Sequence, residues 1–482
     1  MSIKNLEPKL VWGLFDEITK VPRPSKREEK IGKYLVEFAK KHNLDYQCDA
    51  IGNIVIRKAA TPGYEALPTV VLQAHTDMVC EKNSDKVFDF DNDAIETIID
   101  NGWVRANGTT LGADDGIGIA AALAVLIDEK LEHPAIEALF TVDEETGLTG
   151  AFNLGEGMLT GKYLINLDSE DEGEVFIGCA GGVDTIAALP LVTEPAPAGY
   201  VYYEVRISGL LGGHSGDDID KGRANSNKVA ARIAEQAARL HAARIVAFDG
   251  GNLRNAIPRE AKVVVAVPVK ESLKFVGNAI ALGEAIKGEY AFTEPNMDIA
   301  IAECEAQATV LAEATQRQLL LALIGVPTGV LAMSAAMPGL VETSTNLASV
   351  KFEGENIVIT TSQRSSLESA KEYAKLHIES VFVAAGCSVR HSDGYPGWAP
   401  NPHSQLLETT KQAYASLFGV EPKVRAIHAG LECGLFLEKY PHLEMVSFGP
   451  TLRGVHSPDE RLEIATVDKF WKLLIEVLRT IK

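Results

Sequence analysis

Residues 70–79 of the chain read VVLQAHTDMV, and they join an apolar segment to two polar side chains. The first half is β-branched and apolar, which is typical of a strand buried inside a sheet. His75 and Asp77 follow two residues apart, so in an extended chain both side chains point to the same face. Neutral imidazole is a common metal ligand, and a carboxylate can fix its tautomer and orientation. Taken alone, the stretch is equally compatible with a structural His75–Asp77 hydrogen bond.

The composition is that of an acidic globular protein with more than one core. A length of 482 residues favours two domains, and 46% hydrophobic with 23% charged residues is ordinary for such a protein. The 46 basic and 66 acidic residues give a net charge of −20, which argues against nucleic acid or an anionic membrane as partner. The six cysteines are scattered without a C-x-x-C pair, and the first residues lack an apolar signal. We therefore expect a cytoplasmic protein with reduced thiols and no membrane-spanning segment.

Strands and helices alternate through the first part of the chain. A hairpin is predicted at Tyr46–Arg57, and Asp85–Trp103 is predicted as an acidic, irregular segment. A helix at Ile119–Glu129 is followed by strands at Ala135–Val142 and Tyr163–Leu167. This alternation predicts an α/β domain with a mostly parallel sheet.

The alternation stops at Thr193–Gly199, a segment rich in proline and alanine that predicts a linker. The next 200 or so residues show an α+β pattern larger than a single split βαβ unit. Strand and helix then alternate again up to the last predicted helix, Val467–Ile481. We therefore predict a catalytic domain formed by residues 1–192 and 397–482, interrupted by an inserted α+β lid domain at 193–396.

Acidic and imidazole side chains recur where predicted strands end. His75, Asp114, Glu145 and Asp168 each follow a predicted strand, and His456 lies in the loop after the last one. Ligands of open α/β sheets bind beyond the carboxyl ends of the strands. Each residue alone has an ordinary interpretation as a helix cap, a solvated acid or a loop histidine. Five such groups meeting at one edge would need counter-cations, and two divalent ions would satisfy them. Imidazole with carboxylate suits zinc, with manganese or cobalt as substitutes.

The glycine-rich turn Gly112–Gly118 invites a second interpretation, as a dinucleotide-binding loop. Its spacing is not G-x-G-x-x-G, and its two aspartates would face a pyrophosphate at a helix N-terminus that favours anions. The turn therefore argues against a nucleotide-dependent oxidoreductase.

Short motifs along nearly the whole chain resemble a family of co-catalytic zinc peptidases that includes carboxypeptidase G, tripeptide aminopeptidase and carnosinase. Further motifs narrow this resemblance to the dipeptidases of that family. The segments that carry it are Ala74–Met78, Gly112–Gly116, Asp143–Gly147, Asn166–Ser169, Gly178–Gly182, Gly212–Gly216, Leu253–Glu260, His428–Gly434 and His456–Glu460.

The resemblance implies a ligand set for two metal ions. Asp114 would bridge the metals, with His75 and Asp168 completing one site and Glu145 and His456 completing the other. The neighbouring Asp115 is the alternative bridge. A cis peptide bond after Asp114 is also implied, although such bonds are rare outside proline.

The resemblance also implies roles for residues that do not bind metal. Asp77 would orient His75, and Glu144 would be the general base that takes a proton from water and returns it to the leaving amine. His214 would stabilise the oxyanion, although a turn histidine is the simpler interpretation.

Three further residues are candidates for contacts with the ends of a substrate. Arg364 could bind a C-terminal carboxylate, with Asn255 assisting, and Glu432 could receive a free amine. Their ordinary interpretations are a surface arginine, a turn asparagine and a buried structural acid.

The activity implied by the resemblance is hydrolysis of unblocked dipeptides, including Xaa-His substrates such as carnosine, with two zinc ions per subunit. A homodimer formed through the inserted domain is implied as well. Two alternatives remain: an N-acyl amino-acid amidohydrolase with the same metal centre, and a non-catalytic metal-binding scaffold. The scaffold requires a gap in the ligand set or a missing base, and the sequence has neither.

Overall fold

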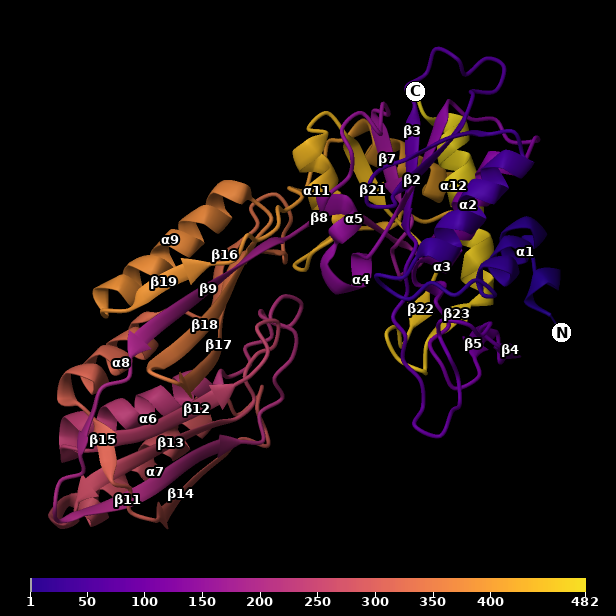
Figure 1. Cartoon of the computed structure of the whole chain (residues 1–482). Coiled ribbons are helices and arrows are strands. Elements are labelled where there is room, and N and C mark those ends of the chain that lie inside the picture. The colour runs from indigo at the N-terminus through magenta and orange to yellow at the C-terminus, as the bar shows by residue number, and fades with distance from the viewer. Residues whose placement is uncertain (1) are drawn as a thin grey trace. The chain divides into compact units, whose positions relative to one another are not determined.

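The computed structural model describes residues 2–482, which form two compact units (Figure 1). The first unit comprises Met1–Gly178, Pro400–Ala426 and Leu431–Lys482. The second unit comprises Cys179–Ala399 and Ile427–Gly430. The second unit thus begins ahead of the predicted boundary at residue 193, because strand β9 (Gly181–Pro190) pairs within its sheet.

An eight-stranded sheet with the order β1-β2-β6-β3-β7-β21-β8-β20 forms the centre of the first unit. Its middle strands β6, β3, β7 and β21 run parallel, and the strands beside them are antiparallel. Every residue of β3, β6 and β7 is buried, which explains why these segments are mainly apolar. The predicted α/β fold is confirmed, and its parallel pairing lies in the four middle strands. The strands are β1 Asp45–Cys48, β2 Ile54–Lys58, β3 Val70–His75, β6 Ile136–Thr141, β7 Tyr163–Asn166, β8 Glu174–Cys179, β20 Lys423–Ile427 and β21 Glu444–Ser447.

Helices pack around this sheet, and α1, α3, α10 and α12 carry large buried faces. Helix α3 contacts β3 and α1, whereas α10 contacts β21 and α12. None of the helices within residues 2–482 is both long and apolar enough to cross a membrane. The helices of this unit are η1 Ile3–Asn5, α1 Lys9–Ile18, α2 Glu29–Lys41, α3 Ala113–Ile127, α4 Glu144–Gly147, α5 Thr149–Phe152, α10 Gln405–Phe418, α11 Glu432–Lys439 and α12 Ile464–Thr480.

A second, four-stranded sheet has the order β22-β23-β5-β4. The prediction of an irregular segment at Asp85–Trp103 is wrong at its end, where β4 pairs with β5 in a hairpin. Asn101 and Gly102 form the two-residue turn, both with positive φ (48° and 86°), as Asn-Gly hairpin turns require. The four strands are β4 Thr97–Asp100, β5 Trp103–Ala106, β22 Leu452–Arg453 and β23 Arg461–Glu463.

The second unit contains two modules with the same βαββαβ topology. One module has the strand order β14-β11-β13-β12, and the other has the equivalent order β19-β9-β18-β17. The first module is inserted between β9 and α8 of the second. Its elements are β11 Tyr200–Ser208, α6 Ser226–His241, β12 Arg244–Gly251, β13 Ala261–Pro268, η2 Val269–Glu271, α7 Ser272–Glu289 and β14 Asp298–Cys304. The other module adds α8 Glu313–Gly325, β16 Gly329–Met333, β17 Val341–Glu353, β18 Asn356–Ser365, α9 Glu368–Ala384 and β19 Ser388–His391.

The two modules share one continuous antiparallel sheet and one core. Strands β12 and β17 meet at Gly250↔Val350 and Gly251↔Ser349. Residues of α6, α7, α8 and α9 pack together in a single apolar cluster. The predicted linker is wrong in its first half, since Thr193–Pro195 forms strand β10 and pairs with β15 (Thr309–Leu311). The segment therefore belongs to the folded unit.

Candidate metal centre

Each of the four middle strands of the first unit leads to one of the predicted metal ligands. His75 ends β3, Glu145 lies in the short helix α4 after β6, and Asp168 follows β7. His456 lies in the loop beyond β21 and β22. Asp114 is different, because the strand before it, β5, belongs to the four-stranded sheet, and Asp114 enters from the start of α3. Asp114 therefore reaches the cluster from outside the main sheet.

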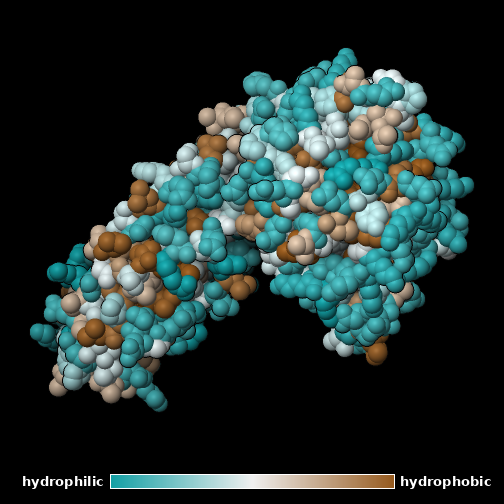
Figure 2. All heavy atoms as spheres, turned by 45° about the horizontal axis from the view of Figure 1, so that its top comes forward, coloured by the Kyte–Doolittle hydropathy of each residue, from teal (hydrophilic) through white to brown (hydrophobic). Residues whose placement is uncertain are grey.

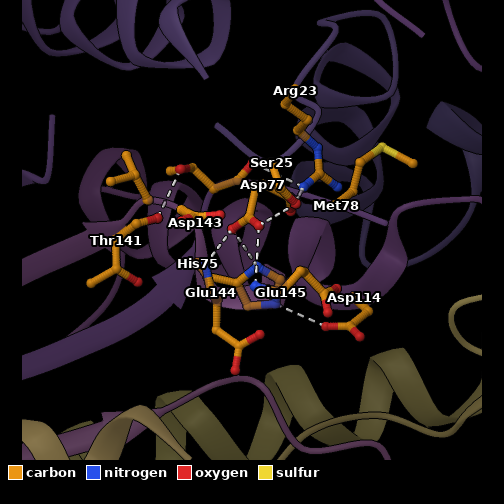
Figure 3. Close-up of polar contacts among 12 residues, drawn as sticks. Arg23, Ser25, His75, Asp77, Met78, Asp114, Thr141, Asp143, Glu144 and Glu145 are labelled. Carbon is orange, nitrogen blue, oxygen red and sulfur yellow. Dashed lines mark hydrogen bonds and ion pairs between the residues drawn. The ribbon is translucent and has the colours of Figure 1, made fainter. Parts of the chain in front are cut away.

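The carboxylate of Asp114 lies between two histidines. Its Oδ1 is 2.9 Å from His75 Nε2, and its Oδ2 is 3.2 Å from His456 Nε2. Figure 3 shows the first of these contacts. One carboxylate with an imidazole at each oxygen is the arrangement expected of a group shared by two cations.

Asp168 lies beside His75, on one side of Asp114, and Glu145 lies beside His456, on the other. Asp168 Oδ1 is 3.4 Å from His75 Nε2, and Glu145 Oε2 is 3.1 Å from His456 Nε2. The other oxygen of Glu145, Oε1, is buried without a hydrogen-bond partner. His75, Asp114 and Glu145 each offer a ligand atom within 4.8 Å of the others. The structure thus brings together all five predicted ligands.

The electrostatics of this cluster favour a positively charged ligand. Burial, assisted by the charge of the neighbouring Asp114, raises the pKa of Asp168 to about 7. Hydrogen bonds with Asp114 and Glu145 raise the pKa of His456 to about 11. Burial alone would lower the pKa of His75, but Asp168 and Asp114 raise it well above its usual value. Cations would relieve the crowding of these acids.

Asp115 serves the helix rather than the cluster. Its Oδ1 accepts a hydrogen bond from Gly118 N at 3.1 Å, at the start of α3. Asp114 and Asp115 are joined by the expected cis peptide bond. Of the two candidate bridges, Asp114 is therefore the one whose oxygens both face imidazoles.

Asp77 holds the turn that carries the two adjacent glutamates. Its Oδ1 and Oδ2 accept hydrogen bonds from the backbone N–H groups of Glu144 (3.0 Å) and Glu145 (3.2 Å). Ser25 Oγ donates to Oδ2 at 2.7 Å, and His75 Nδ1 lies 3.4 Å from Oδ1. Figure 3 shows Asp77 between the histidine and the turn. Asp77 therefore orients His75 and fixes the position of the glutamates together.

Glu144 is partly buried, and within residues 2–482 its carboxylate has no hydrogen-bond partner. Burial raises the pKa of Glu144 well above its usual value, and Asp168 adds to the effect. An unpartnered carboxyl group with a raised pKa beside a ligand cluster is suited to accept and return a proton.

Two residues that sequence reasoning missed hold the Asp114 turn from opposite sides. Glu460 is buried and accepts hydrogen bonds from the N–H groups of Leu111 (2.7 Å), Gly112 (3.0 Å) and Ala113 (2.7 Å). Arg23, also buried, donates to the carbonyl groups of Gly112 and of Thr76 and Asp77. The sequence signal that could have found Glu460 is the His456–Glu460 motif, which places an acid four residues after a predicted ligand.

A network of hydrogen-bonded polar side chains links the neighbouring strands β21, β7 and β3 close to the predicted ligands. Ser447 donates to Asn166 (2.5 Å), Asn166 to Gln73 (2.6 Å), and Gln73 to Glu432 Oε2 (2.6 Å). Thr141 donates to the same oxygen at 2.9 Å. Burial raises the pKa of Glu432 to about 8, and only 2% of the residue is exposed. These contacts are those of a buried structural acid, and its role with a substrate amine stays a prediction.

The remaining predicted residues lie in the second unit. His214 and Ala256 form an isolated antiparallel β-bridge. His214 Nδ1 accepts hydrogen bonds from the backbone N–H groups of Gly216 (3.3 Å) and Asp217 (3.2 Å). Asn255 is exposed, and its backbone carbonyl accepts from Ser215. Arg364 lies on β18 with 7% exposure, so it is not the surface arginine of the simpler interpretation.

Comparison with known proteins identifies the class. Residues 71–480 match peptidase family M20/M25/M40, and the chain belongs to this family. The predicted resemblance is thereby confirmed.

Individual relatives are similar over the full length. The chain is 42% identical to the cytosol non-specific dipeptidase of Escherichia coli K12, covering 100% of this chain and 99% of that protein. It superposes with a TM-score of 0.96 and 43% identity on the aminoacylhistidine dipeptidase of Vibrio alginolyticus, covering 100% of this chain and 98% of that one. A tripeptidase from Staphylococcus aureus shares the fold at 16% identity, with a TM-score of 0.56 and 99% of both chains covered.

Proposed function

We propose that this chain is a dizinc metallopeptidase that hydrolyses unblocked dipeptides, including Xaa-His substrates of the carnosine type. The observation that carries the proposal is the Asp114 carboxylate, whose two oxygens face His75 Nε2 at 2.9 Å and His456 Nε2 at 3.2 Å. Family membership and the dipeptidase names of its two full-length relatives support the reaction and favour it over the amidohydrolase alternative.

The donor set fits two divalent cations. Glu145 Oε1 is buried with no partner, and the crowded carboxylates have too few protein cations beside them. We assign His75 and Asp168 to one ion and Glu145 and His456 to the other, with Asp114 shared. Carboxylate and imidazole ligands favour zinc, with manganese or cobalt as substitutes. When bound, such ions polarise the scissile carbonyl and acidify a water molecule.

The protein supplies the proton transfer. Glu144 takes the proton of the attacking water and returns it to the leaving amine, and its raised pKa suits both steps. Asp77 keeps Glu144 and Glu145 in fixed relative positions through their backbone N–H groups. Glu145 is thereby held for the metal while Glu144 stays unpartnered for catalysis.

Residues of the second unit are assigned to the substrate. Because Nδ1 of His214 accepts backbone N–H groups, its Nε2 carries the hydrogen and can donate to an oxyanion. Arg364 would bind the C-terminal carboxylate, with the exposed Asn255 assisting. Glu432 remains the candidate for the free amine.

We also propose that the protein is a cytoplasmic homodimer that associates through the second unit. Figure 2 shows hydrophobic patches on this part of the surface, at the left of the view. Helices α8 and α9 expose the apolar residues Leu321, Ile324, Tyr373, Leu376 and Val383. Such a group of exposed apolar side chains is typical of an isologous interface. The name of the Escherichia coli relative, cytosol non-specific dipeptidase, supports a cytosolic location.

Light scattering tests the dimer. We expect Leu376→Glu to convert a dimer into a monomer, whereas Leu273→Glu on α7, which is also exposed, should leave the dimer intact. A monomeric wild type, or equal behaviour of both variants, would refute this surface.

The reaction is tested with zinc-loaded protein and paired substrates. We expect two equivalents of zinc per chain, and turnover of alanyl-histidine and carnosine but not of their N-acetyl forms. Removal of the metal should abolish turnover, and added zinc should restore it. Turnover of the acetylated compounds alone would exclude the dipeptidase.

A further inference from the structure

A buried arginine without an anionic partner lies on strand β18 of the second unit. Arg364 Nη1 donates to Tyr395 Oη at 2.9 Å, and Arg364 Nε is buried with no partner. No carboxylate within residues 2–482 forms an ion pair with this guanidinium. Because an unpaired buried charge is costly, the site is incomplete without an anion.

Two glycines hold the ring of Tyr395 beside this arginine. Gly182 is the direct cross-strand neighbour of Arg364, and a Cβ there would lie 2.7 Å from the tyrosine ring. A Cβ at Gly430 would lie 2.8 Å from the same ring. Both glycines belong to motifs that the metal centre leaves unexplained. Their lack of side chains allows Tyr395 to reach Arg364 and fix the direction of its guanidinium.

A second buried group with an unused nitrogen lies next to Arg364. Ser344 is the other cross-strand neighbour of Arg364, and its Oγ is 2.7 Å from His428 Nε2. His428 Nδ1 is buried and has no partner. Burial, assisted by the charge of Arg364, lowers the pKa of His428 to about 4. The ring is therefore neutral at pH 7 and carries one hydrogen.

The contact with Ser344 determines where that hydrogen can lie. The serine hydroxyl rotates freely, so it can donate to Nε2 and leave the hydrogen on Nδ1. In that tautomer His428 presents a buried N–H donor beside a cation. An anionic oxygen is the acceptor that this surrounding favours.

Asp217, an acid near Arg364, does not supply the missing anion. Its carboxylate lies 3.4 Å from His214 Nδ1, and among residues 2–482 it forms no ion pair with Arg364. The loop of His428 comes close to this turn because Gly216 has no side chain: a Cβ there would lie 2.1 Å from His428 O. Among residues 2–482, Arg364 Nε and His428 Nδ1 thus stay without a partner.

We propose that Arg364 and His428 together bind the C-terminal carboxylate of the substrate, with His428 Nδ1–H as the second donor and Tyr395 as a positioning residue for Arg364. This inference rests on the proposed dipeptidase function. It adds His428 and Tyr395 to the arginine named above and lies entirely within the second unit. Two N–H donors, one on each of two side chains that neighbour Ser344, match the two oxygens of a carboxylate.

The test compares two replacements of His428 that keep different nitrogens. Asparagine places its amide near the position of Nδ1, whereas glutamine places it near Nε2. We expect His428→Gln to raise KM for alanyl-histidine by about 10- to 100-fold, as for loss of a hydrogen bond to a charged group, with kcat little changed. His428→Asn should recover most of the affinity. Neither should alter KM for alanyl-histidinamide, which lacks the carboxylate.

Tyr395→Phe provides an independent measurement if the histidine variants do not fold. It should raise KM for alanyl-histidine more than for the amide. The opposite order, with Gln active and Asn impaired, would show that only the Ser344 contact matters and would overturn the inference. Equal changes for acid and amide, or no change in Tyr395→Phe, would overturn it as well. A wild type inactive on all dipeptides would instead refute the proposed function.

Discussion

Each unit of this protein contains charged side chains that lack a partner among residues 2–482, and these charges are negative in the first unit and positive in the second. In the first unit, acids crowd around two imidazoles, and one oxygen of Glu145 has no partner. In the second unit, the buried guanidinium of Arg364 has no carboxylate, and a histidine nitrogen beside it is unused. The unpartnered groups thus indicate the class of ligand: cations for the first unit, and an anion for the second.

The two sites are also built differently. Apart from Asp114, the predicted ligands of the first unit follow neighbouring parallel strands. Carboxylates such as Asp77 and Glu460 hold their loops through consecutive backbone N–H groups. In the second unit, the site is formed by cross-strand neighbours on three adjacent antiparallel strands, namely Gly182, Arg364 and Ser344. A parallel sheet gathers ligands at one edge, whereas an antiparallel sheet gathers them on one face.

The largest expected effect separates the two adjacent glutamates of the first unit. Glu144→Gln should lower kcat by about 10²- to 10⁴-fold, as for loss of a general base, while zinc content stays at the wild-type level. Glu145→Gln should instead lose zinc, because its carboxylate faces His456. Steady-state kinetics and metal analysis of both proteins measure this. Full activity in Glu144→Gln would remove the base from the mechanism.

A smaller effect is expected where the first unit holds its Asp114 turn. Glu460→Gln replaces an acceptor oxygen by a donor amide facing backbone N–H groups, so zinc affinity should fall by about 10- to 100-fold. Asp459→Asn is the matched control, because Asp459 is exposed and adjacent. Chelator competition measures both affinities. Equal affinity of the two variants would show that the turn does not depend on Glu460.

The smallest effect concerns the neutral histidine of the second unit. The folded-state pKa of His428, about 4, lies below the unfolded value, so between these values the unfolded chain binds a proton that the folded protein does not. Stability therefore falls as the pH falls through this window. When the pH falls from 7.5 to 5.5, the free energy of unfolding of His428→Asn should decrease by about 1 kcal/mol less than that of the wild type.

Denaturant unfolding at the two pH values measures this difference. His403→Asn serves as the control, because His403 is exposed. Parallel pH dependence in wild type and His428→Asn would mean that the pKa of His428 is the same in the folded and the unfolded protein, contrary to the effect expected from burial of its ring.

Much of the fold was predictable because its signals are local. Mainly apolar segments such as Val70–His75 and Ile136–Thr141 indicate buried strands, and the structure has them. The hairpin at Asn101 and Gly102 was equally readable, but the acidic residues before it obscured the signal. The two modules of the second unit were not predictable, since one is inserted into the other and their common topology leaves no short repeat in the sequence.

The sequence alone identified the chemical types and the order of the metal-site residues, because motifs such as Ala74–Met78 and Asp143–Gly147 place acids and imidazoles at strand ends. The resemblance favoured Asp114 over Asp115, and the tertiary structure gives the geometry: both oxygens of Asp114 face imidazoles, whereas Asp115 accepts a hydrogen bond at the start of α3. The tertiary structure alone placed His428 and Tyr395 beside Arg364. The physical reason is that periodicity and residue type act over a few neighbours along the chain. Burial and hydrogen-bond partners depend on strands that are far apart in the sequence.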